Sequence, residues 1–323
     1  MKALLLRQLH QPLEYSDFDI PKPGKNQVLV NLYAAALNHR DLFITQGLYA
    51  GIKMPVILGS DGAGEYQGKR VLLYPALEWG DRSAHQGKNF RVLGMPENGT
   101  FAEKICIPRR NLLEMPSHLN WEQGAALPLA GLTAWRALFS RCRLKNREKV
   151  LITGVGGGVA LQALQFAVAA GAQVAVTSGS EEKLERARSL GAHFTANYRE
   201  EGWDKKLKQA AGGFDVIIDS AAGNGFSALI GLANPGARIG VYGGTLGKVD
   251  GFSLQPVFWK QISILGSTMG SPQEFKKMLD FVAAHKIVPV VDKVFDLKNG
   301  NAALERMEKG EQFGKIVTRI TQM

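Results

Sequence analysis

The segment LITGVGGGVA, from Leu151 to Ala160, concentrates glycines where a backbone could bind a phosphate. Aliphatic residues precede it and a helical pattern follows it, which is the context of a dinucleotide fingerprint. Glycines let the backbone approach a pyrophosphate, and a helix N-terminus offers free N–H groups. The strict G-x-G-x-x-G spacing is not kept, because its first position falls on Val155, so a tight turn between strand and helix is the alternative. The expected cofactor-binding residues of this loop are Gly154, Gly156, Gly157, Gly158 and Val159.

The residues that follow the next expected strand bear on which dinucleotide binds. An acidic residue about 20 positions beyond the loop would bind the ribose 2′-hydroxyl of NAD. The sequence reads TSGS at that place, and Glu181 is the first acid. Ser178, Ser180 and Lys183 offer hydroxyl donors and a positive charge for a 2′-phosphate, although Ser180 would equally cap a helix and Lys183 would equally be a surface lysine. We therefore expect NADP(H) rather than NAD(H).

Two kinds of pattern divide the chain. The first hundred-odd residues read as short strands separated by Gly, Pro and Asn, for example at 27–33, 70–74 and 101–107. From Trp121 a helical period, interrupted at Pro128, leads into alternating apolar strands and helices, which predicts a parallel sheet covered on both faces. The strands expected there are 149–153, 173–177, 193–198, 216–219, 237–242 and 263–267, and the helices are 159–170 and 181–190. A helix at 272–285 precedes a strand, a short helix and a last strand, GKIVTRI, a tail that can return to the first domain.

The composition is that of a globular protein, with 45% hydrophobic and 21% charged residues among 323. No apolar run approaches a membrane span and the N-terminus lacks a signal-peptide pattern, so we expect a cytoplasmic protein that binds no membrane. The net charge of +10 is consistent with nucleic-acid binding, but the basic residues form no tract and no nucleic-acid motif is present. A basic solvated surface is the better interpretation. Two cysteines, Cys106 and Cys142, are too few for a disulfide framework or a four-cysteine zinc site.

The order of the segments resembles a known family. The β-rich part, ALPLAGLTAWRALF, the glycine loop, EEKLERARSLGA and FGKIVTRI together resemble the medium-chain dehydrogenase/reductase superfamily along essentially the whole chain, and in particular its zinc-independent, quinone oxidoreductase-like members. The resemblance implies an α/β fold, with a GroES-like β-rich catalytic domain at 1–120, a Rossmann doubly wound parallel sheet at 121–270, and a C-terminal segment at 271–323 that returns to the catalytic domain. It also implies an active site in the cleft between the domains and a homodimer joined through the Rossmann edge strand near 262–267.

The resemblance also locates the positions at which relatives hold a catalytic zinc ion. They match Asn38 in LNHRD, Ser60 and Asp61 in LGSDGAG, and Ala130 in PLAGLTA. None of these residues supplies a thiolate or an imidazole, and Asp61 alone cannot hold zinc. The stretch 77–100, which matches the structural-zinc lobe of relatives, contains no cysteine, and the six histidines lack metal-ligand spacing. We therefore expect no zinc.

For catalysis, the resemblance implies roles for Asn38, Asp41, Tyr49 and Thr133. Asn38 and Asp41 match an N-x-x-D pattern, in which Asn38 would hydrogen-bond the nicotinamide ribose or the substrate carbonyl and Asp41 would orient its neighbours. Tyr49 in QGLY would line the pocket and donate a hydrogen bond or a proton, and Thr133 in GLTA would lie near the nicotinamide. Each has a purely structural alternative, such as a loop-capping amide, a packed ring or a helix threonine bonded to the preceding turn. Phe43 stands where some relatives carry tyrosine, which favours a more apolar pocket.

Further cofactor-binding residues are implied outside the glycine loop. Tyr198 in ANYRE resembles a tyrosine that flanks the adenosine 2′-phosphate, with a plain strand end as the alternative. A strand ends at VYGGT, where a tight turn is the alternative, and the late segments around Gly270 and in FGK match parts near the nicotinamide. Lys315 would equally be a surface lysine. The residues added by this comparison are Tyr198, Gly243, Gly244, Gly270, Gly314 and Lys315.

The expected function follows from the missing metal. Zinc stabilises an alkoxide as a Lewis acid, and without it a better substrate already has an electrophilic, conjugated carbon. We expect hydride transfer from NADPH to a small-molecule electrophile, a quinone or an α,β-unsaturated carbonyl, with hydrogen-bond donors stabilising the developing negative charge. One alternative is a metal-free alcohol/carbonyl oxidoreductase that uses a positioned tyrosine or water. Another is a non-catalytic NADPH-binding sensor, because fold alone does not fix function.

Overall fold

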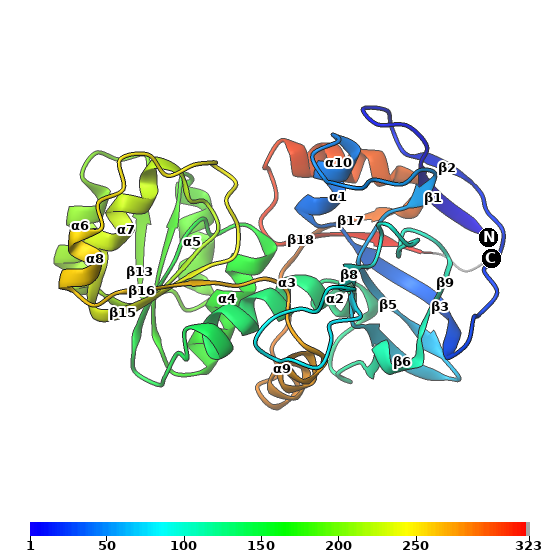
Figure 1. The fold of residues 1–323 in the computed structure, drawn as a ribbon, viewed down its shortest axis with the longest axis horizontal. Coiled ribbons are helices and arrows are strands. Elements are labelled where there is room, and N and C mark those ends of the chain that lie inside the picture. Colours follow the sequence, from blue (N-terminus) through cyan, green and yellow to red (C-terminus); the bar gives the residue numbers. More distant parts are fainter. Residues whose placement is uncertain (321–323) are drawn as a thin grey trace. The chain divides into compact units, whose positions relative to one another are not determined.

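The computed structural model describes residues 1–320, and the chain forms two compact units (Figure 1). Unit 1 consists of Met1–Leu132 and the segment from Gly270 onward, and unit 2 consists of Thr133–Met269. The sequence places residues 121–132 in the dinucleotide-binding domain and residue 270 at its end, but here both belong to unit 1. The helix α2 (Trp121–Ala125) explains the difference, since it packs against strands β3 (Gln27–Ala36) and β5 (Asp61–Tyr66) of unit 1.

Unit 1 is built on mostly antiparallel sheets, in which β17 and β18 pair in parallel. One sheet has the order β2-β1-β4, a larger one the order β10-β6-β5-β3-β18-β17 with β9 also paired to β3, and β7 pairs with β8. The other strands of unit 1 are β1 (Lys2–Leu6), β2 (Glu14–Asp17), β4 (Val56–Ile57), β6 (Lys69–Leu73), β7 (Ala76–Leu77), β8 (Arg91–Val92), β9 (Lys104–Pro108), β10 (Leu112–Glu114), β17 (Val291–Asp296) and β18 (Lys315–Arg319). The other helices of unit 1 are α1 (His39–Thr45), η1 (Arg109–Asn111), α9 (Pro272–Ala284), η4 (Leu297–Asn299) and α10 (Gly300–Glu308), while α3 (Pro128–Trp135) runs across the unit boundary.

The end of the chain is part of unit 1, as its sequence pattern indicates. β18 pairs antiparallel with β3, so that Val317 lies opposite Ala36. The helix α9 before it starts in the way its sequence predicts. Ser271 accepts a hydrogen bond from Glu274 N and Glu274 Oε2 accepts one from Ser271 N, which is a capping box, and Pro272 stands in the first turn. The tail thus contributes β18 to the sheet that contains β3.

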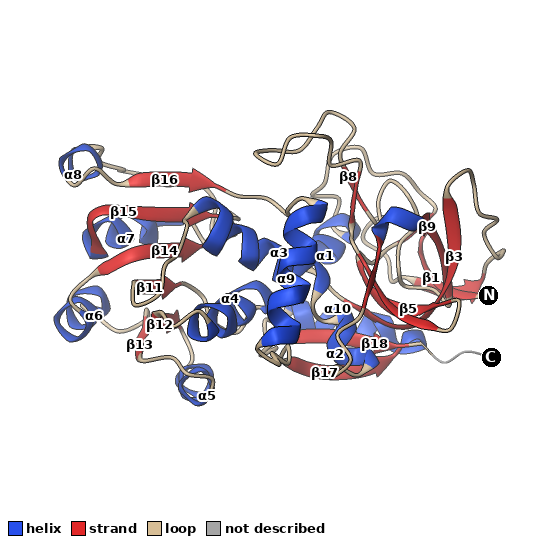
Figure 2. Cartoon of the chain, turned by 90° about the horizontal axis from the view of Figure 1, so that it is seen from below, coloured by secondary structure: helices blue, strands red, loops and turns tan. Residues whose placement is uncertain are grey.

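Unit 2 is a six-stranded parallel sheet with the order β13-β12-β11-β14-β15-β16 (Figure 2). Its strands are β11 (Lys149–Ile152), β12 (Gln173–Ser178), β13 (Phe194–Asn197), β14 (Phe214–Asp219), β15 (Ala233–Val241) and β16 (Ser263–Gly266). Its helices are η2, a π-helix (Arg136–Arg141), α4 (Gly158–Ala169), α5 (Glu181–Ser189), α6 (Trp203–Ala211), η3 (Gly223–Gly225), α7 (Phe226–Leu232) and α8 (Gln255–Trp259). Val150, Leu151 and Ile152 are all fully buried, so β11 is covered on both faces. The expected doubly wound sheet is confirmed.

Two features follow from this topology. The strand order reverses direction between β11 and β14, and in such sheets ligands bind beyond the carboxyl ends of the strands at that point. The other end of the order is β16, which is the edge strand expected near 262–267.

Within residues 1–320, no helix is long and apolar enough to cross a lipid bilayer.

Candidate functional site

The glycine loop of unit 2 lies at the carboxyl end of β11. Gly154 and Gly156 have φ angles of 66° and 134°, which residues with a side chain rarely adopt. The loop is tied to β12, because Val155 N donates to the carbonyl of Thr177 at 2.7 Å and Gly154 N donates to the Thr177 hydroxyl at 3.3 Å. The backbone path from β11 into α4 therefore requires glycine at these positions.

The start of α4 is open toward a ligand. Gly157 is the N-cap of this 12-residue helix, and within the described part of the chain no side chain caps it. A Cβ added at Gly154 or Gly157 would meet no atom within 4 Å. Because the first N–H groups of a helix have no partner inside the helix, those of Gly158 and Val159 are available to an anion.

Hydroxyl and basic side chains border this loop from β12 and α5. Ser178 ends β12 and its hydroxyl accepts a hydrogen bond from Ser180 N at 3.2 Å. Ser180 is the N-cap of α5, and its hydroxyl accepts from Lys183 N at 3.4 Å, which is the capping alternative that the sequence allowed. The Lys183 side chain extends over the loop, since its Cδ would lie 3.0 Å from a Cβ at Gly156.

A tyrosine and an arginine approach the same edge from the end of β13. A Cβ at Gly179 would lie 2.8 Å from Arg199 Nε and 2.9 Å from the Tyr198 hydroxyl. Tyr198 is 48% exposed. Glu181, the first acid after β12, accepts a hydrogen bond from the Asn197 amide at 2.7 Å. The end of β12 thus gathers hydroxyl groups and positive charge, and its nearest carboxylate is bound to a neighbouring amide.

The switch point between β11 and β14 carries its own polar contact. The Thr153 hydroxyl donates to Asp219 Oδ1 at 2.6 Å, and Asp219 Oδ2 accepts from Ala222 N at 2.9 Å. Gly243 and Gly244 follow β15 at the same edge of the sheet. A Cβ at Gly243 would lie 3.0 Å from the carbonyl oxygen of Ser220, so this turn needs a residue without a large side chain. Burial raises the pKa of the neighbouring Tyr242 to about 12.

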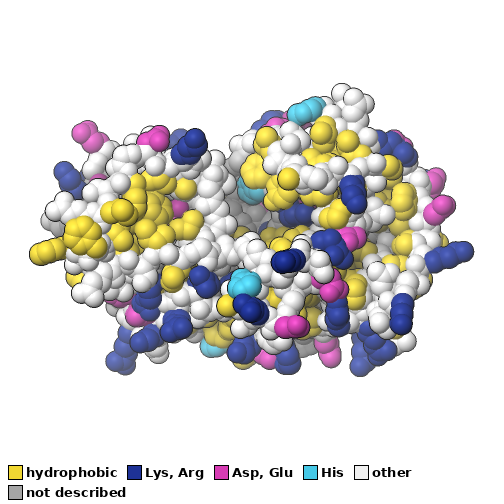
Figure 3. All heavy atoms as spheres, viewed as in Figure 1, with side chains coloured by type: hydrophobic (Ala, Val, Ile, Leu, Met, Phe, Trp, Pro, Cys, Tyr) yellow, Lys and Arg dark blue, Asp and Glu magenta, His cyan; other side chains and the backbone are white. Residues whose placement is uncertain are grey.

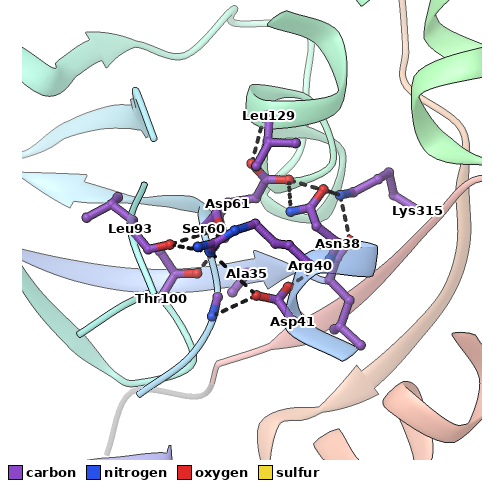
Figure 4. A network of polar contacts seen from close by, with 12 residues as sticks. Ala35, Asn38, Arg40, Asp41, Ser60, Asp61, Leu93, Thr100, Leu129 and Lys315 are labelled. Carbon is purple, nitrogen blue, oxygen red and sulfur yellow. Dashed lines mark hydrogen bonds and ion pairs between the residues drawn. The ribbon is translucent and has the colours of Figure 1, made fainter. Parts of the chain in front are cut away.

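Unit 1 contains a buried polar centre made by Asn38, Asp61 and Lys315 (Figure 4). Lys315 Nζ donates to Asp61 Oδ2 at 2.9 Å, to Asn38 Oδ1 at 2.7 Å and to the carbonyl of Leu37 at 2.6 Å. Asn38 Nδ2 donates to Asp61 Oδ2 at 3.0 Å, and Leu129 N donates to Asp61 Oδ1 at 2.7 Å. Four elements therefore converge, namely the N-terminus of α1, the start of β5, the first turn of α3 and the start of β18.

A second layer of contacts holds α1 against its neighbours. Asp41 Oδ2 accepts from Asn38 N at 2.8 Å and Asp41 Oδ1 accepts from Gly59 N at 3.3 Å. Arg40 donates to the Ser60 hydroxyl at 2.8 Å and to the carbonyl of Leu93 at 2.7 Å. Burial raises the pKa of the Asp41 carboxyl, while the Arg40 charge and the Asn38 backbone N–H oppose the rise. Asp41 thus joins the start of α1 to the segment before β5, and its role in orienting its neighbours for catalysis stays a prediction.

Tyr49 and His39 lie at the outer side of α1. The Arg40 guanidinium carbon lies 5.7 Å from the centre of the Tyr49 ring, and this tyrosine is 39% exposed. His39 begins α1 and its ring packs at 6.2 Å from that of Phe43. Desolvation by the surrounding protein lowers the pKa of His39, and the Lys315 charge lowers it further.

Two of the expected residues lie apart from these groups. Thr133 is buried within α3 and is the first residue of unit 2. Gly270 lies in unit 1, where its carbonyl accepts from the Tyr74 hydroxyl at 2.7 Å and a Cβ on it would lie 2.5 Å from Leu132 Cδ1. These contacts explain why residue 270 is a glycine. The roles of Thr133 in catalysis and of Gly270 in cofactor binding stay predictions.

The structure adds residues that the sequence reasoning did not include. Asp61 was considered only as a failed zinc ligand, yet its position in LGSDGAG after an apolar strand is a signal for a buried carboxylate. Arg199 follows Tyr198 directly and could have been included with it. Arg40 gave no usable signal, because an arginine in a helix is most often exposed. Among residues 1–320 there is no group of three or more His, Cys, Asp or Glu side chains that could hold a metal ion.

Comparisons with known proteins agree with this architecture. Residues 24–117 match the alcohol dehydrogenase GroES-like domain, and residues 158–284 match the zinc-binding dehydrogenase domain. A zinc-type alcohol dehydrogenase-like protein, YogA, of Leptosphaeria maculans is 36% identical over 97% of this chain and 96% of its own length. The crystal structure of an NAD-dependent alcohol dehydrogenase is 34% identical, covers 99% of this chain and all of that one, and has a TM-score of 0.94. The quinone oxidoreductase of Thermus thermophilus, solved also in complex with NADPH, is 26% identical over 99% of this chain and all of that one, with a TM-score of 0.83. The chain therefore belongs to the medium-chain dehydrogenase/reductase superfamily of oxidoreductases.

Proposed function

We propose that this oxidoreductase transfers a hydride from NADPH to a conjugated carbonyl, a quinone or an α,β-unsaturated ketone or aldehyde, without a metal. The observation that carries the proposal is which side chains form the polar centre of unit 1 and how they are hydrogen-bonded. Its one carboxylate, on Asp61, is bound to the Lys315 ammonium and the Asn38 amide. A site with these groups offers fixed hydrogen bonds rather than a Lewis acid, which suits a substrate that is already electrophilic.

The residues of the polar centre do not fit the zinc ion that the name of the matched domain implies. Zinc in proteins takes thiolate, imidazole and carboxylate ligands. The side chains at the matching positions are Asn38, Ser60, Asp61 and Ala130, of which only Asp61 is a usual ligand. Both oxygens of Asp61 already accept hydrogen bonds from the protein. No step of the proposed reaction therefore uses a metal.

The glycine loop fits a pyridine nucleotide. The open space beside Gly154 and Gly157 and the uncapped start of α4 would admit a pyrophosphate. The groups at the end of β12 favour the phosphorylated form of the coenzyme, because Lys183 and Arg199 bring positive charge and Tyr198 brings a hydroxyl. The name of one similar structure contains NAD, but it is the side chains beside the 2′-position that select the coenzyme.

When bound, NADPH would supply the hydride that adds to the electrophilic carbon. In the proposed reaction the chain's residues orient the acceptor and stabilise the charge that develops on its oxygen. Asn38 has one Nδ2 hydrogen bonded to Asp61 and a second one left for the acceptor oxygen or the nicotinamide ribose. Tyr49 is the proposed donor of the proton that completes the reduction. Asp41 keeps α1 in place, and Asn38 with it, through the contacts with Asn38 N and Gly59 N.

The test is NADPH consumption by the purified protein with a panel of acceptors. A soluble ortho-quinone and a simple enone are compared with a saturated aldehyde, and a primary alcohol is tried with NADP⁺. We expect turnover with the conjugated acceptors at least about tenfold above that with the saturated aldehyde, because only the former form a delocalised oxyanion. Faster turnover of the aldehyde and alcohol would replace the proposal with a metal-free alcohol/carbonyl oxidoreductase. NADPH binding without turnover of any acceptor would indicate a sensor.

We further propose that the partner of the chain is a second copy, joined through the edge of the unit 2 sheet. Among the strands of residues 1–320, β16 pairs with β15 alone, and an exposed edge strand is a template for another strand. Leu254, Phe258 and Trp259 next to it are 64%, 66% and 81% exposed, and Figure 3 shows hydrophobic side chains gathered over this part of unit 2. Light scattering should give a dimer for the wild type and a monomer for Phe258→Glu/Trp259→Glu, with Ile20→Glu as the control. A monomeric wild type at micromolar concentration would refute it.

A further inference from the structure

The ammonium group of Lys315 is fully coordinated inside unit 1. A lysine has three donors and no acceptor, and here all three donors have protein partners, on Asp61, Asn38 and Leu37. Lys315 is 4% exposed and Asp61 is completely buried. Figure 4 shows the lysine reaching across to the carboxylate and the amide from β18. The group therefore behaves as a bound cation rather than as a surface lysine.

A cation is needed at this place. A buried carboxylate without a counter-charge is strongly destabilising. Within residues 1–320, the other hydrogen-bond donors to the Asp61 carboxylate are the neutral groups Asn38 Nδ2 and Leu129 N. The nearby acid Asp41 has its own partners in Arg40, at 4.0 Å, and two backbone N–H groups. The positive charge of Lys315 and the negative charge of Asp61 thus neutralise each other within the centre.

The same cation fixes the direction of the Asn38 amide. Its oxygen accepts from the ammonium, and its nitrogen donates to the carboxylate. A rotation of the amide by 180° would place the NH₂ group against the ammonium and the oxygen against the carboxylate, so both contacts would become repulsive. Asn38 is 8% exposed, so no solvent shell can compensate for the loss. Its second Nδ2 hydrogen is consequently held in one direction.

The backbone that carries Lys315 is itself held in place. Gly314 has a φ of 116°, and a Cβ there would lie 2.4 Å from the carbonyl oxygen of Val290. Phe313 N donates to Asp292 Oδ1 at 3.0 Å, and the same carboxylate accepts two hydrogen bonds from Arg306, at 2.6 and 3.1 Å. The backbone before Lys315 is therefore fixed by packing and hydrogen bonds. A side chain that only filled a cavity would not need such support.

We propose that Lys315 is the resident cation of the polar centre, where it is the counter-charge of Asp61, and that it is a positioning residue for Asn38. The positioning role rests on the proposed function. The role as counter-charge of Asp61 does not, because it requires no reaction. The competing role is that of a structural ion pair with no effect on turnover. The two roles differ in what happens when both charges are removed together.

The experiment compares Lys315→Met, Asp61→Asn and the double variant with the wild type and with Lys309→Met. Lys309 is an exposed lysine paired with Glu305 and serves as the control for loss of one lysine. Each single variant leaves one buried charge without its partner, so we expect its melting temperature to fall by about 10 °C, and the double variant to regain most of this loss. Additive losses in the double variant would overturn the assignment of Lys315 as the counter-charge.

Turnover in the double variant tests the positioning role. Because the amide of Asn38 is then free to rotate, we expect kcat with NADPH and an ortho-quinone to stay at least about tenfold below the wild type. A double variant that is both stable and fully active would show a structural pair only. If the wild type turns over no acceptor, the proposed function fails, and the melting temperatures still decide whether Lys315 is the cation.

Metal uptake gives a readout that needs no activity. The wild type is dialysed against Co²⁺, and the bound metal is counted after removal of the excess. We expect no stoichiometric Co²⁺ in the wild type, because the ammonium already uses the oxygen of Asn38 and shares that of Asp61. One equivalent of Co²⁺ in the wild type, lost in Asp61→Asn, would overturn the proposal.

Discussion

The polar centre of unit 1 and the glycine loop of unit 2 differ in whether their hydrogen-bonding groups have partners within the protein. In the centre, each donor of the Lys315 ammonium has a protein acceptor, and both oxygens of Asp61 are occupied. At the loop, a Cβ on Gly157 would meet nothing within 4 Å, and the helix that follows has no side-chain cap within residues 1–320. Folding therefore provides hydrogen-bond partners for the polar groups of the centre, whereas the loop keeps N–H donors available to an anion.

This difference predicts where substitutions take effect. Changing a group in a satisfied, buried network leaves its partners unpaired, so the cost appears in the stability of the protein. Changing a group that faces open space alters no contact of the free protein, so the cost appears only when the ligand binds. The following substitutions test this division, beginning with the largest expected effect.

Gly314→Ala should break the support of the centre. The new Cβ would lie 2.4 Å from the Val290 carbonyl oxygen, at a φ of 116°, and we expect a loss of about 3 kcal/mol in the stability of unit 1, combining backbone strain and overpacking. Gly310→Ala is the control, because its φ is 65° and a Cβ there meets nothing within 4 Å. Urea unfolding measures both, and equal losses in the two variants would refute the packing argument.

Gly157→Ala should affect the loop only when coenzyme binds. No protein atom lies near the added Cβ, so the melting temperature should be unchanged. Loss of backbone contact to the pyrophosphate should cost roughly 2 kcal/mol, or about 30-fold in the Kd for NADPH. Fluorescence titration measures the affinity. Gly231→Ala, in α7 and equally free of neighbours, is the control, and an unchanged Kd in Gly157→Ala would show that the loop does not bind the coenzyme.

Arg199→Ala should change the choice of coenzyme. Its guanidinium lies beside Gly179 at the end of β12, and the loss of a charge-assisted contact should weaken NADPH about tenfold and leave NADH unchanged. Lys205→Ala removes the same charge from the exposed side of α6 and should change neither affinity. Equal weakening of both coenzymes in Arg199→Ala would mean that this side chain does not contact the 2′-phosphate.

His39→Gln should have the smallest effect, on the pH dependence of stability. The pKa of His39 is lower in the folded protein, mainly through desolvation and then through the Lys315 charge. The unfolded chain therefore binds more protons between the two pKa values, and stability falls as the pH drops through the unfolded value of about 6.5. The variant should show a shallower decline between pH 7 and pH 5 than the wild type and than His85→Gln. An unchanged slope would contradict the assignment.

The sequence predicted the unit 2 elements well because their signals are local. Short apolar runs bounded by glycines gave β11, β12 and β16 within one or two residues, and the Ser180 cap and glutamate-rich first turn gave α5. Helices α1, α6, α7 and α8 were not predicted. In α1 the residues Arg40 and Asp41 are buried through contacts with residues 18 to 53 positions away, and no local pattern reveals such burial.

The sequence identified individual residues of the site but not the hydrogen bonds between them. The sequence selected Asn38 and Lys315 separately, one for catalysis and one for the coenzyme, and the structure joins them through a hydrogen bond across 277 positions. Asp61 was set aside because it could not hold zinc, although the property that matters here is its need for a cation. Pairing of a buried acid with a distant lysine depends on how β5 and β18 flank β3, which is information about the fold.

One rate measured on one sample tests whether turnover needs NADPH and no metal. NADPH oxidation with a soluble ortho-quinone is followed before and after treatment with a strong chelator, and again after addition of Zn²⁺. We predict the same rate in all three conditions, since Asn38 Oδ1 and Asp61 Oδ2 already accept hydrogen bonds from the Lys315 ammonium. A rate that falls with the chelator and returns with Zn²⁺ would contradict the account.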